Sequence, residues 1–205
     1  SPFDSLKLKG VLEKTIIGGE ESEIVNTGSI SIRGQHNLYN SLAASLAAKT
    51  MRIPTASLRA TLRNFRGVEH RLEFVRERNG VSYVNDSKAT NVDSVRYALQ
   101  SFERPVVLLL GGRDKGNDYS SLRDLMKKHV KAIIAIGESA DKVTSAFSQE
   151  IPVSTAASME QAVEAAAHVA SPGDVVLLSP ACASFDWFQN YEHRGRVFKD
   201  AVMNM

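Results

Sequence analysis

Three polar stretches of this sequence carry the residue types that bind a charged small molecule. The stretch "NDSKATN" (85–91) places two amides, a carboxylate, an ammonium and two hydroxyls within seven residues. The stretch "GGRDKGND" (111–118) combines paired glycines, which permit a tight turn, with the cation Lys115, and "SPACAS" (179–184) consists of small residues that end at Ser184. Ammonium and hydroxyl groups hold carboxylates and phosphates through short, charge-assisted hydrogen bonds. The chemistry indicated is recognition of an anionic ligand.

Each stretch also has a purely structural interpretation. Capping a helix needs one polar side chain, which Asp86, Ser87 or Asn91 could supply, but "NDSKATN" has more polar groups than a cap requires. "GGRDKG" alone fits an ordinary turn and matches a phosphate loop poorly, because no Ser or Thr follows its lysine. We expect Ser184 to cap the final helix in addition to any binding role. Cys182 is better explained as a buried small residue than as a nucleophile.

The elements that position these stretches alternate between strands and helices. The segments "PVVLLL" (105–110), "KAIIAIG" (131–137) and "DVVLLS" (174–179) are continuously apolar, as strands covered on both faces of a parallel sheet are. Asn79-Gly80 predicts a hairpin turn ahead of them, and a shorter strand is expected through "PVSTA" (152–156). Helices are expected at about 91–102, 119–129, 139–147, 158–169 and 187–203. The prediction is a Rossmann-like α/β fold with a mostly parallel sheet and helices on both faces. In such sheets ligands bind outside the carboxyl ends of the strands, which is where the three polar stretches fall.

The sequence changes in character near Phe65, so we expect two parts, 1–66 and 67–205. Residues 1–33 have the pattern of short antiparallel strands with glycine turns at 18–19 and at Gly28, and helices are expected at 36–53 and 55–65. In the first of these helices Asn37 and Asn40 share a face and could offer amides to a base or a ribose. Taken in isolation, the pair is better explained as one capping and one exposed asparagine. The chain opens without Met and with strands that have no preceding partner, so we expect the first part to be the tail of another α/β domain in a longer protein.

Composition excludes several functional classes. The chain has 205 residues, 43% of them hydrophobic, and a formal net charge of +2, which gives no long-range field for nucleic acid. No apolar run approaches the roughly 18 residues of a membrane span, and the single cysteine excludes an internal disulfide framework. We therefore expect a cytoplasmic protein that binds neither nucleic acid nor membranes.

Taken in order along the chain, these motifs resemble the Mur ligase family, and within it the branch that adds D-glutamate. The resemblance rests on "GQHNLYNSLAA", "FRGVEHRLEFV", "NDSKATN", "GGRDKG" and "SPACASFDWFQNYEHRGRVFKD", which together run through nearly the whole chain. The pieces "NDSKATN" and "SPACASFDWF" discriminate best among the branches. The resemblance implies an ATP-dependent ligase of peptidoglycan precursor synthesis. It further implies that residues 1–66 are the C-terminal part of a central ATP-binding domain and that residues 67–205 form a domain that binds the amino acid.

The resemblance also implies a role for individual residues. The implied ATP contacts are Asn37, Asn40, Arg71, Asp86 and Lys88. The implied D-glutamate contacts are Thr90, Lys115, Ser184, Phe185 and Tyr191, the last at a position where an aromatic ring is usual. Lys88 and Lys115 are the implied catalytic cations, because charge must be stabilised on a transferring phosphoryl group and on the amino-acid substrate.

The small-molecule partners implied are ATP, D-glutamate and UDP-N-acetylmuramoyl-L-alanine, acted on by a monomer that uses Mg²⁺. By the same resemblance the phosphate loop, the metal ligands, the carbamylated lysine and the UDP-binding domain precede Ser1, so this chain alone is expected to be inactive. The alternatives are a stand-alone α/β module that binds a nucleotide or an acidic metabolite, an interaction protein, and another Mur or folylpolyglutamate synthetase type of ligase.

Overall fold

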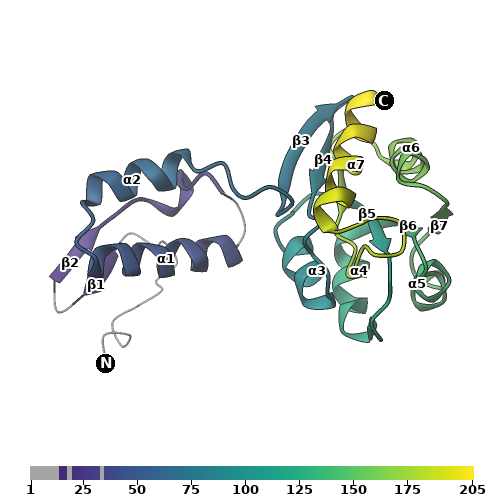
Figure 1. Cartoon of the computed structure of the whole chain (residues 1–205), viewed down its shortest axis with the longest axis horizontal. Helices are drawn as coiled ribbons and strands as arrows, with labels where there is room; N and C mark the ends of the chain where they lie inside the picture. The colour runs from purple at the N-terminus through teal and green to yellow at the C-terminus, as the bar shows by residue number, and fades with distance from the viewer. Residues whose placement is uncertain (1–13, 18–19, 33–34) are drawn as a thin grey trace. The chain divides into compact units, whose positions relative to one another are not determined.

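The computed structural model describes residues 14–17, 20–32 and 35–205, and the chain divides after Gly67 into two compact units. Figure 1 draws both units with their helices and strands labelled.

The first unit contains a short antiparallel strand pair and two helices. Its elements are β1 (Lys14–Ile17), β2 (Glu20–Glu23), the 3₁₀ turn η1 (Thr27–Ser29), α1 (Gln35–Thr50) and α2 (Thr55–Asn64). Ile24, Val25, Ile30 and Leu58 form its buried cluster. The two helices are confirmed, whereas residues 24–32 form no strand, and Gly28 lies in η1. The expected turn at 18–19 and any strand before residue 14 lie outside the described residues.

The second unit is built on a six-stranded sheet in the order β3-β4-β8-β5-β6-β7. Its strands are β3 (Glu73–Arg78), β4 (Val81–Asn85), β5 (Val106–Gly111), β6 (Val130–Ile136), β7 (Val153–Ala156) and β8 (Val175–Leu178). Only the β3–β4 pair is antiparallel; the other neighbours are parallel. The hairpin between β3 and β4 turns at Asn79 and Gly80, both with positive φ. The predicted α/β class and mostly parallel sheet are confirmed.

Helices cover both faces of this sheet (Figure 1). They are α3 (Val92–Leu99), the turn η2 (Ser120–Leu122), α4 (Arg123–His129), α5 (Ala140–Phe147), α6 (Met159–Val169) and α7 (Tyr191–Asn204). Alternate side chains of each central strand separate the two cores: Leu108 and Leu177 pack with α3, α4 and α5, whereas Leu109 and Leu178 pack with α6 and α7. This alternation explains why the strand sequences are apolar throughout.

Strand β8 creates a switch point in this sheet. It lies between β4 and β5, which are consecutive in the sequence, and it is followed by α7 on one face while β4 and β5 are followed by α3 and α4 on the other. Connections that diverge to opposite faces open a crevice at the carboxyl ends of the strands. "NDSKATN" spans the end of β4 and the loop after it, "GGRDKGND" the end of β5 and its loop, and "SPACAS" the residues directly after β8.

Candidate functional site

Asp86, directly after β4, is the buried carboxylate of the crevice. Its Oδ2 accepts a hydrogen bond from Ser179 Oγ at 2.9 Å, and its Oδ1 accepts one from the backbone N–H of Leu72 at 3.2 Å. Burial raises the pKa of Asp86 to about 7, and these two hydrogen bonds and the charge of Arg71 oppose that rise. Asp86 therefore links the start of β3 to the β8 loop and is poised to titrate near neutral pH.

Lys88 and Tyr191 form a direct pair across the crevice. Lys88 Nζ donates to the Tyr191 hydroxyl at 3.0 Å and lies 4.8 Å from the centre of its ring. Tyr191 is the first residue of α7, which Asn190 caps by accepting a hydrogen bond from the His193 N–H. The helix start thus brings an aromatic ring onto the one ammonium of the β4 loop.

Close backbone contacts join the β5, β6 and β8 loops. The N–H of Arg113 donates to the Ala183 carbonyl at 2.9 Å, and the N–H of Gly112 donates to Ser139 Oγ at 3.1 Å. A Cβ on Gly112 would lie 2.5 Å from the Ala183 oxygen, and one on Gly137 would lie 2.1 Å from Asp186 Oδ2. Both glycines have positive φ. Glycine is required at these two positions by conformation and by space.

Arg194 holds the crevice together, and its importance was missed in the sequence. Its guanidinium is almost wholly buried on α7, with Nε donating to Ser87 Oγ at 2.9 Å and Nη2 to the Ser87 carbonyl at 2.8 Å. Nη1 donates to the carbonyls of Cys182 at 3.1 Å and Ala183 at 3.3 Å. Burial lowers the pKa of Arg194 to about 10, so the group remains charged at neutral pH. A single side chain therefore ties α7 to both the β4 and the β8 loops.

Ser184 does not cap the final helix, so that prediction was wrong. Its carbonyl accepts the Phe188 N–H at 2.9 Å, which closes a single turn, and α7 begins only at Tyr191 with Asn190 as its cap. Among the side chains proposed as caps for α3, Asn91 has that role, accepting from the Ser94 N–H at 2.8 Å. Asn190 and Asn91 adopt the extended backbone that a capping residue needs, followed by helical residues.

Comparison with known proteins assigns the second unit. Residues 70–182, more than half of the chain, match the family model described as "Mur ligase, glutamate ligase domain". The chain belongs to the Mur ligase family.

Similar proteins place this Mur ligase chain near one named activity. It is 51% identical, over 89% of its length, to a UDP-N-acetylmuramoylalanine--D-glutamate ligase of Salinibacter ruber, covering 40% of that protein. It is 44% identical, over its whole length, to the protein of that name from Christiangramia forsetii, covering 49% of it. A pseudomurein peptide ligase type C from Methanothermus fervidus shares the fold, with a TM-score of 0.68 at 19% identity over 94% of this chain and 40% of that one. The chain spans less than half the length of these proteins.

Several predicted site residues of the Mur ligase chain lie at the crevice without a described partner side chain. Lys115 and Phe185 are exposed on the β5 and β8 loops, and Thr90 is partly buried in the β4 loop. No hydrogen bond between described residues joins Thr90 to Lys115 or to Ser184, and their shared role stays a prediction. Cys182 is fully buried, with Asn117 Nδ2 3.3 Å from its sulfur.

The two predicted asparagines of the first unit lie on α1. Asn37 is partly buried and Asn40 is exposed, three residues apart on the helix. That spacing agrees with a shared face. Their predicted contact with a nucleotide is not tested by the geometry of this unit.

Beside the crevice, a charged cluster surrounds the buried His70. The ligand atoms of Glu69, His70 and Glu73 lie within 4.8 Å of one another, the one such group with metal-binding spacing among the described residues. Lys199 Nζ already contacts both carboxylates, at 2.5 Å for Glu69 Oε1 and 2.9 Å for Glu73 Oε1. The cluster therefore carries its own cation, and we assign no metal to it.

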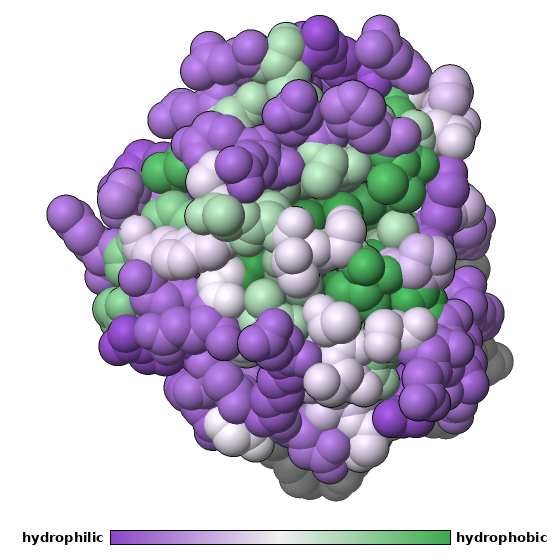
Figure 2. Space-filling view, turned by 90° about the vertical axis from the view of Figure 1, so that its right-hand side faces the viewer, coloured by the Kyte–Doolittle hydropathy of each residue, from purple (hydrophilic) through white to green (hydrophobic). Residues whose placement is uncertain are grey.

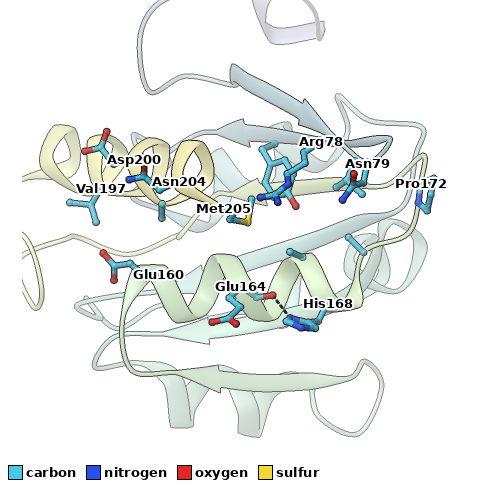
Figure 3. Close-up of a pocket in the computed structure, with 15 residues that line it drawn as sticks. Arg78, Asn79, Glu160, Glu164, His168, Pro172, Val197, Asp200, Asn204 and Met205 are labelled. Atoms are coloured by element: carbon cyan, nitrogen blue, oxygen red, sulfur yellow. Dashed lines mark hydrogen bonds between the residues drawn. The ribbon is translucent and has the colours of Figure 1, made fainter.

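A separate hollow lies between α6 and α7 of the Mur ligase domain. Figure 2 shows apolar residues gathered there among hydrophilic ones, and Figure 3 shows Glu164 and His168 on α6 and, on the other side of the hollow, Asn204 at the end of α7 and Met205 after it. Its volume is about 860 Å³, and its lining includes Asn79 of the β3–β4 turn, so it opens near the amino end of β4. None of the predicted site residues lines it.

The helices of the described residues were also compared with the length and hydropathy of a membrane span. None of them is both long enough and apolar enough to cross a bilayer.

Proposed function

We propose that this chain is part of an ATP-dependent ligase that adds D-glutamate to UDP-N-acetylmuramoyl-L-alanine in peptidoglycan precursor synthesis. The observation that carries the proposal is the meeting of the β4, β5 and β8 loops at the switch point of the sheet, with Lys88 and Lys115 in two of them. The names of relatives at 44% and 51% identity support D-glutamate over the substrates of other branches.

The two units receive different roles in this proposal. Residues 1–66 close the central ATP-binding domain, with Asn37 and Asn40 as contacts of the nucleotide. Residues 67–205 bind the amino acid. The whole protein is proposed to be a cytoplasmic monomer with small molecules as its partners.

Amide formation requires the muramoyl-alanine carboxylate to be activated as an acyl phosphate at the expense of ATP, which releases ADP. The amine of D-glutamate then attacks the acyl carbon, and inorganic phosphate leaves. Lys88, held against Tyr191, would stabilise negative charge on the phosphoryl group. Arg71 and Asp86 would contact the nucleotide.

D-Glutamate must be held with its amine free to react. Lys115 would meet a substrate carboxylate as a point charge, and the Thr90 and Ser184 hydroxyls would add hydrogen bonds. Phe185 and Tyr191 would form walls. Holding the substrate by its carboxylates orients the amine and lowers the entropy cost of the attack. Mg²⁺, when bound, would neutralise phosphate charge, and no step here depends on its position. The one described group of three side chains with metal-binding spacing, Glu69, His70 and Glu73, is already contacted by Lys199.

Titration with D-glutamate tests the binding part of the proposal. We expect saturable amide shifts clustered at Thr90, Lys115 and Ser184 when D-glutamate is added to the 205-residue chain, and a loss of at least about tenfold in affinity in Lys115→Ala, since one charge-assisted hydrogen bond contributes about 1.5–3 kcal/mol. Lys128→Ala is the matched control, because Lys128 is an exposed lysine of α4 ahead of the amino end of β6. Equal affinity for D-glutamate and L-glutamate would show that the proposal of a pocket specific for the D-enantiomer is wrong.

A turnover measurement tests the role of this chain within the ligase. We expect no ADP release from the 205-residue chain with ATP and both substrates, because the chain spans less than half the length of the D-glutamate ligases to which it is similar. ADP release that depends on both substrates would refute that assignment.

A further inference from the structure

Asn85, the last residue of β4, is fully buried and has an amide whose orientation is determined by its neighbours. Its Oδ1 accepts the Ser87 N–H at 3.2 Å, and its Nδ2 donates to Glu73 Oε2 at 2.9 Å. Exchanging the oxygen and nitrogen would place a donor against a donor at Ser87 and an acceptor against an acceptor at Glu73. Two independent partners therefore fix Nδ2 on the side of His70.

This orientation determines the tautomer of His70. Asn85 Nδ2 lies 2.9 Å from His70 Nδ1 and can only donate, so Nδ1 must present its lone pair. The remaining proton of the ring is then on Nε2, which faces Glu69 Oε1 at 3.7 Å. A second proton on Nδ1 would set two N–H groups against each other. The site requires neutral His70 with its proton on Nε2.

We propose that Asn85 and the neutral, Nε2-protonated form of His70 act together as a positioning pair for Lys88 and Tyr191. The proposal deepens the proposed function, because it concerns how those two site residues are held. His70 accepts the Lys88 N–H on its carbonyl at 3.1 Å, and Asn85 accepts the neighbouring Ser87 N–H. The backbone that carries the Lys88 ammonium is thus hydrogen-bonded to both members of the pair.

Helix α7 rests on the same pair. The rings of His70 and Tyr191 meet edge to face with centres 6.0 Å apart. A Cβ at Gly195 would lie 2.2 Å from His70 Nδ1 and 3.0 Å from Asn85 Nδ2, so α7 approaches this closely only because residue 195 is glycine. Ser87 Oγ also donates to the Tyr191 carbonyl at 2.8 Å. A displacement of His70 or Asn85 is therefore transmitted to both Lys88 and Tyr191.

The charges around His70 come from three segments. Glu69 precedes β3, Glu73 lies on β3, and Glu192 and Lys199 lie on α7. The carboxylates raise the pKa of His70, but burial, the largest effect, and the charge of Lys199 lower it, and the net pKa is below the usual value. Because Lys199 pairs with Glu69 and Glu73, the ring remains neutral among three acids.

Nitrogen NMR of the histidine rings tests the tautomer in the unaltered 205-residue chain. We expect the His70 ring at pH 7 to show a protonated Nε2 and an unprotonated Nδ1, with a pKa lower than that of an exposed histidine because the ring is buried. We also expect the amide signals of Ser87, Lys88 and Tyr191 to shift on acidification with the midpoint of His70 in an Asp86→Asn chain, where the neighbouring carboxyl no longer titrates near neutral pH. The proposal would be overturned by a proton on Nδ1 at pH 7. It would also be overturned if the amide signals of Lys88 and Tyr191 did not shift as His70 titrates.

The variant Asn85→Asp inverts the hydrogen bond. A carboxylate can accept but not donate, so its oxygen would face Glu73 Oε2 as well as His70 Nδ1, and a proton on Nδ1 would relieve both contacts. We expect the pKa of His70 to rise by at least about one unit from the added negative charge. The pH midpoints at which the amide signals of Lys88 and Tyr191 shift should rise together with the pKa of His70. The matched control is Asn91→Asp, which adds the same charge to the same loop at an exposed cap where Asp also serves; its His70 pKa should change by less than about 0.3 units. An unchanged His70 pKa in a folded Asn85→Asp chain would contradict the proposal, and if that variant does not fold, the ring measurement on the unaltered chain decides.

The outcome is separable from that of the proposed function. Failure of D-glutamate to bind would remove the proposed substrate but leave the ring tautomer and the coupled titrations measurable in the free chain. Conversely, D-glutamate binding with a proton on Nδ1 of His70 would retain the function and remove the positioning pair.

Discussion

At the scale of single residues, the crevice depends on buried polar groups that have few acceptable substitutes. Asp86, Asn85, Ser87 and Arg194 are all buried, and each hydrogen bonds to a segment far away in the sequence. In an interior of low polarity, an unmade hydrogen bond costs more than a made one gains. Substitution at these positions is therefore expected to affect stability as well as binding.

Asp86 makes the stability of the chain depend on pH. Its pKa of about 7 in the folded state exceeds the usual value near 3.8, so the folded state binds more protons between these values and loses stability as pH rises. We expect Asp86→Asn to remove this loss, because its Oδ1 can accept the Leu72 N–H and its Nδ2 can donate to Ser179 Oγ, with the direction of that second hydrogen bond reversed. Measured by urea unfolding, the difference in unfolding free energy between the variant and the unaltered chain should shift by up to about 4 kcal/mol from pH 4 to pH 8 in favour of the variant. Asp200→Asn, at an exposed site on α7, should leave the dependence of the unfolding free energy on pH unchanged. If the unfolding free energies of Asp86→Asn and the unaltered chain changed in parallel with pH, the expectation would be contradicted.

Arg194 requires a planar fork and not merely a charge. Lysine at this position could not reach Ser87, Cys182 and Ala183 together, so buried carbonyls would lose their donors. We expect Arg194→Lys to lower the unfolding free energy by about 2–3 kcal/mol. Arg196→Lys is the control, because Arg196 is exposed on the same helix, and it should cost less than about 0.5 kcal/mol. Equal losses in the two variants would show that the fork is dispensable.

Sequence predicted the residues of the crevice better than it predicted the groups that support them. The residue types in "NDSKATN" predict a site, because more polar side chains adjoin one helix start than a cap requires. Arg194 gave no such signal, since its partners are backbone carbonyls and a serine hydroxyl in loops. Every residue has a backbone carbonyl, so the sequence does not show which carbonyls will accept a hydrogen bond from an arginine. Ser184 was misassigned because a single turn and the Asn190 cap intervene before α7, and this depends on backbone conformation.

At the scale of elements, the loops after β5, β6 and β8 pack so closely that a side chain at Gly112 or Gly137 would collide with a neighbouring loop. Gly137 and Gly116 both have positive φ, but a Cβ on Gly137 would meet Asp186 Oδ2 at 2.1 Å and Gly112 Cα at 2.7 Å, whereas one on Gly116 would meet nothing within 4 Å. The two positions therefore separate the cost of backbone conformation from the cost of crowding.

We expect Gly116→Ala to cost about 1 kcal/mol for the positive φ alone. Gly137→Ala should cost about 3 kcal/mol or more, because atoms of the β5 and β8 loops must also move. Thermal and urea unfolding measure both losses, and amide shifts at Glu138 and Asp186 report the displacement, since the Glu138 N–H donates to Asp186 at 3.1 Å. Similar losses in the two variants would mean that the loops yield without cost.

Strand order is the part of the fold that the elements could not predict. Apolar, β-branched runs identified β5, β6 and β8, and Asn79-Gly80 identified the hairpin, because these are local signals. The insertion of β8 between β4 and β5 depends on contacts across roughly 90 residues of chain, which no local pattern encodes. That insertion is also what gives the crevice its three loops.

At the scale of the whole molecule, the second unit contains a complete set of interactions. Its two cores, on the two faces of the sheet, consist entirely of residues after Gly67. The groups around the crevice also find their partners within it: Leu72 with the buried Asp86, His70 with the buried Asn85, and the exposed Glu69 with the partly buried Lys199. We therefore expect residues 68–205, produced alone, to fold in one cooperative transition with amide signals matching those of the 205-residue chain.

A shorter chain, 73–205, provides the matched control for this expectation. Removing Val68–Leu72 deletes no strand of the sheet. It removes the Leu72 N–H that donates to Asp86, the His70 ring that accepts from Asn85, and the Glu69 carboxylate that pairs with Lys199. Buried groups left without partners cost about 1–3 kcal/mol each, so 73–205 should lose about 3 kcal/mol or more of unfolding free energy relative to 68–205. Equal stability of the two chains would show that the segment before β3 is not part of the folded unit, and broad amide signals from 68–205 itself would show that the unit needs the first 67 residues.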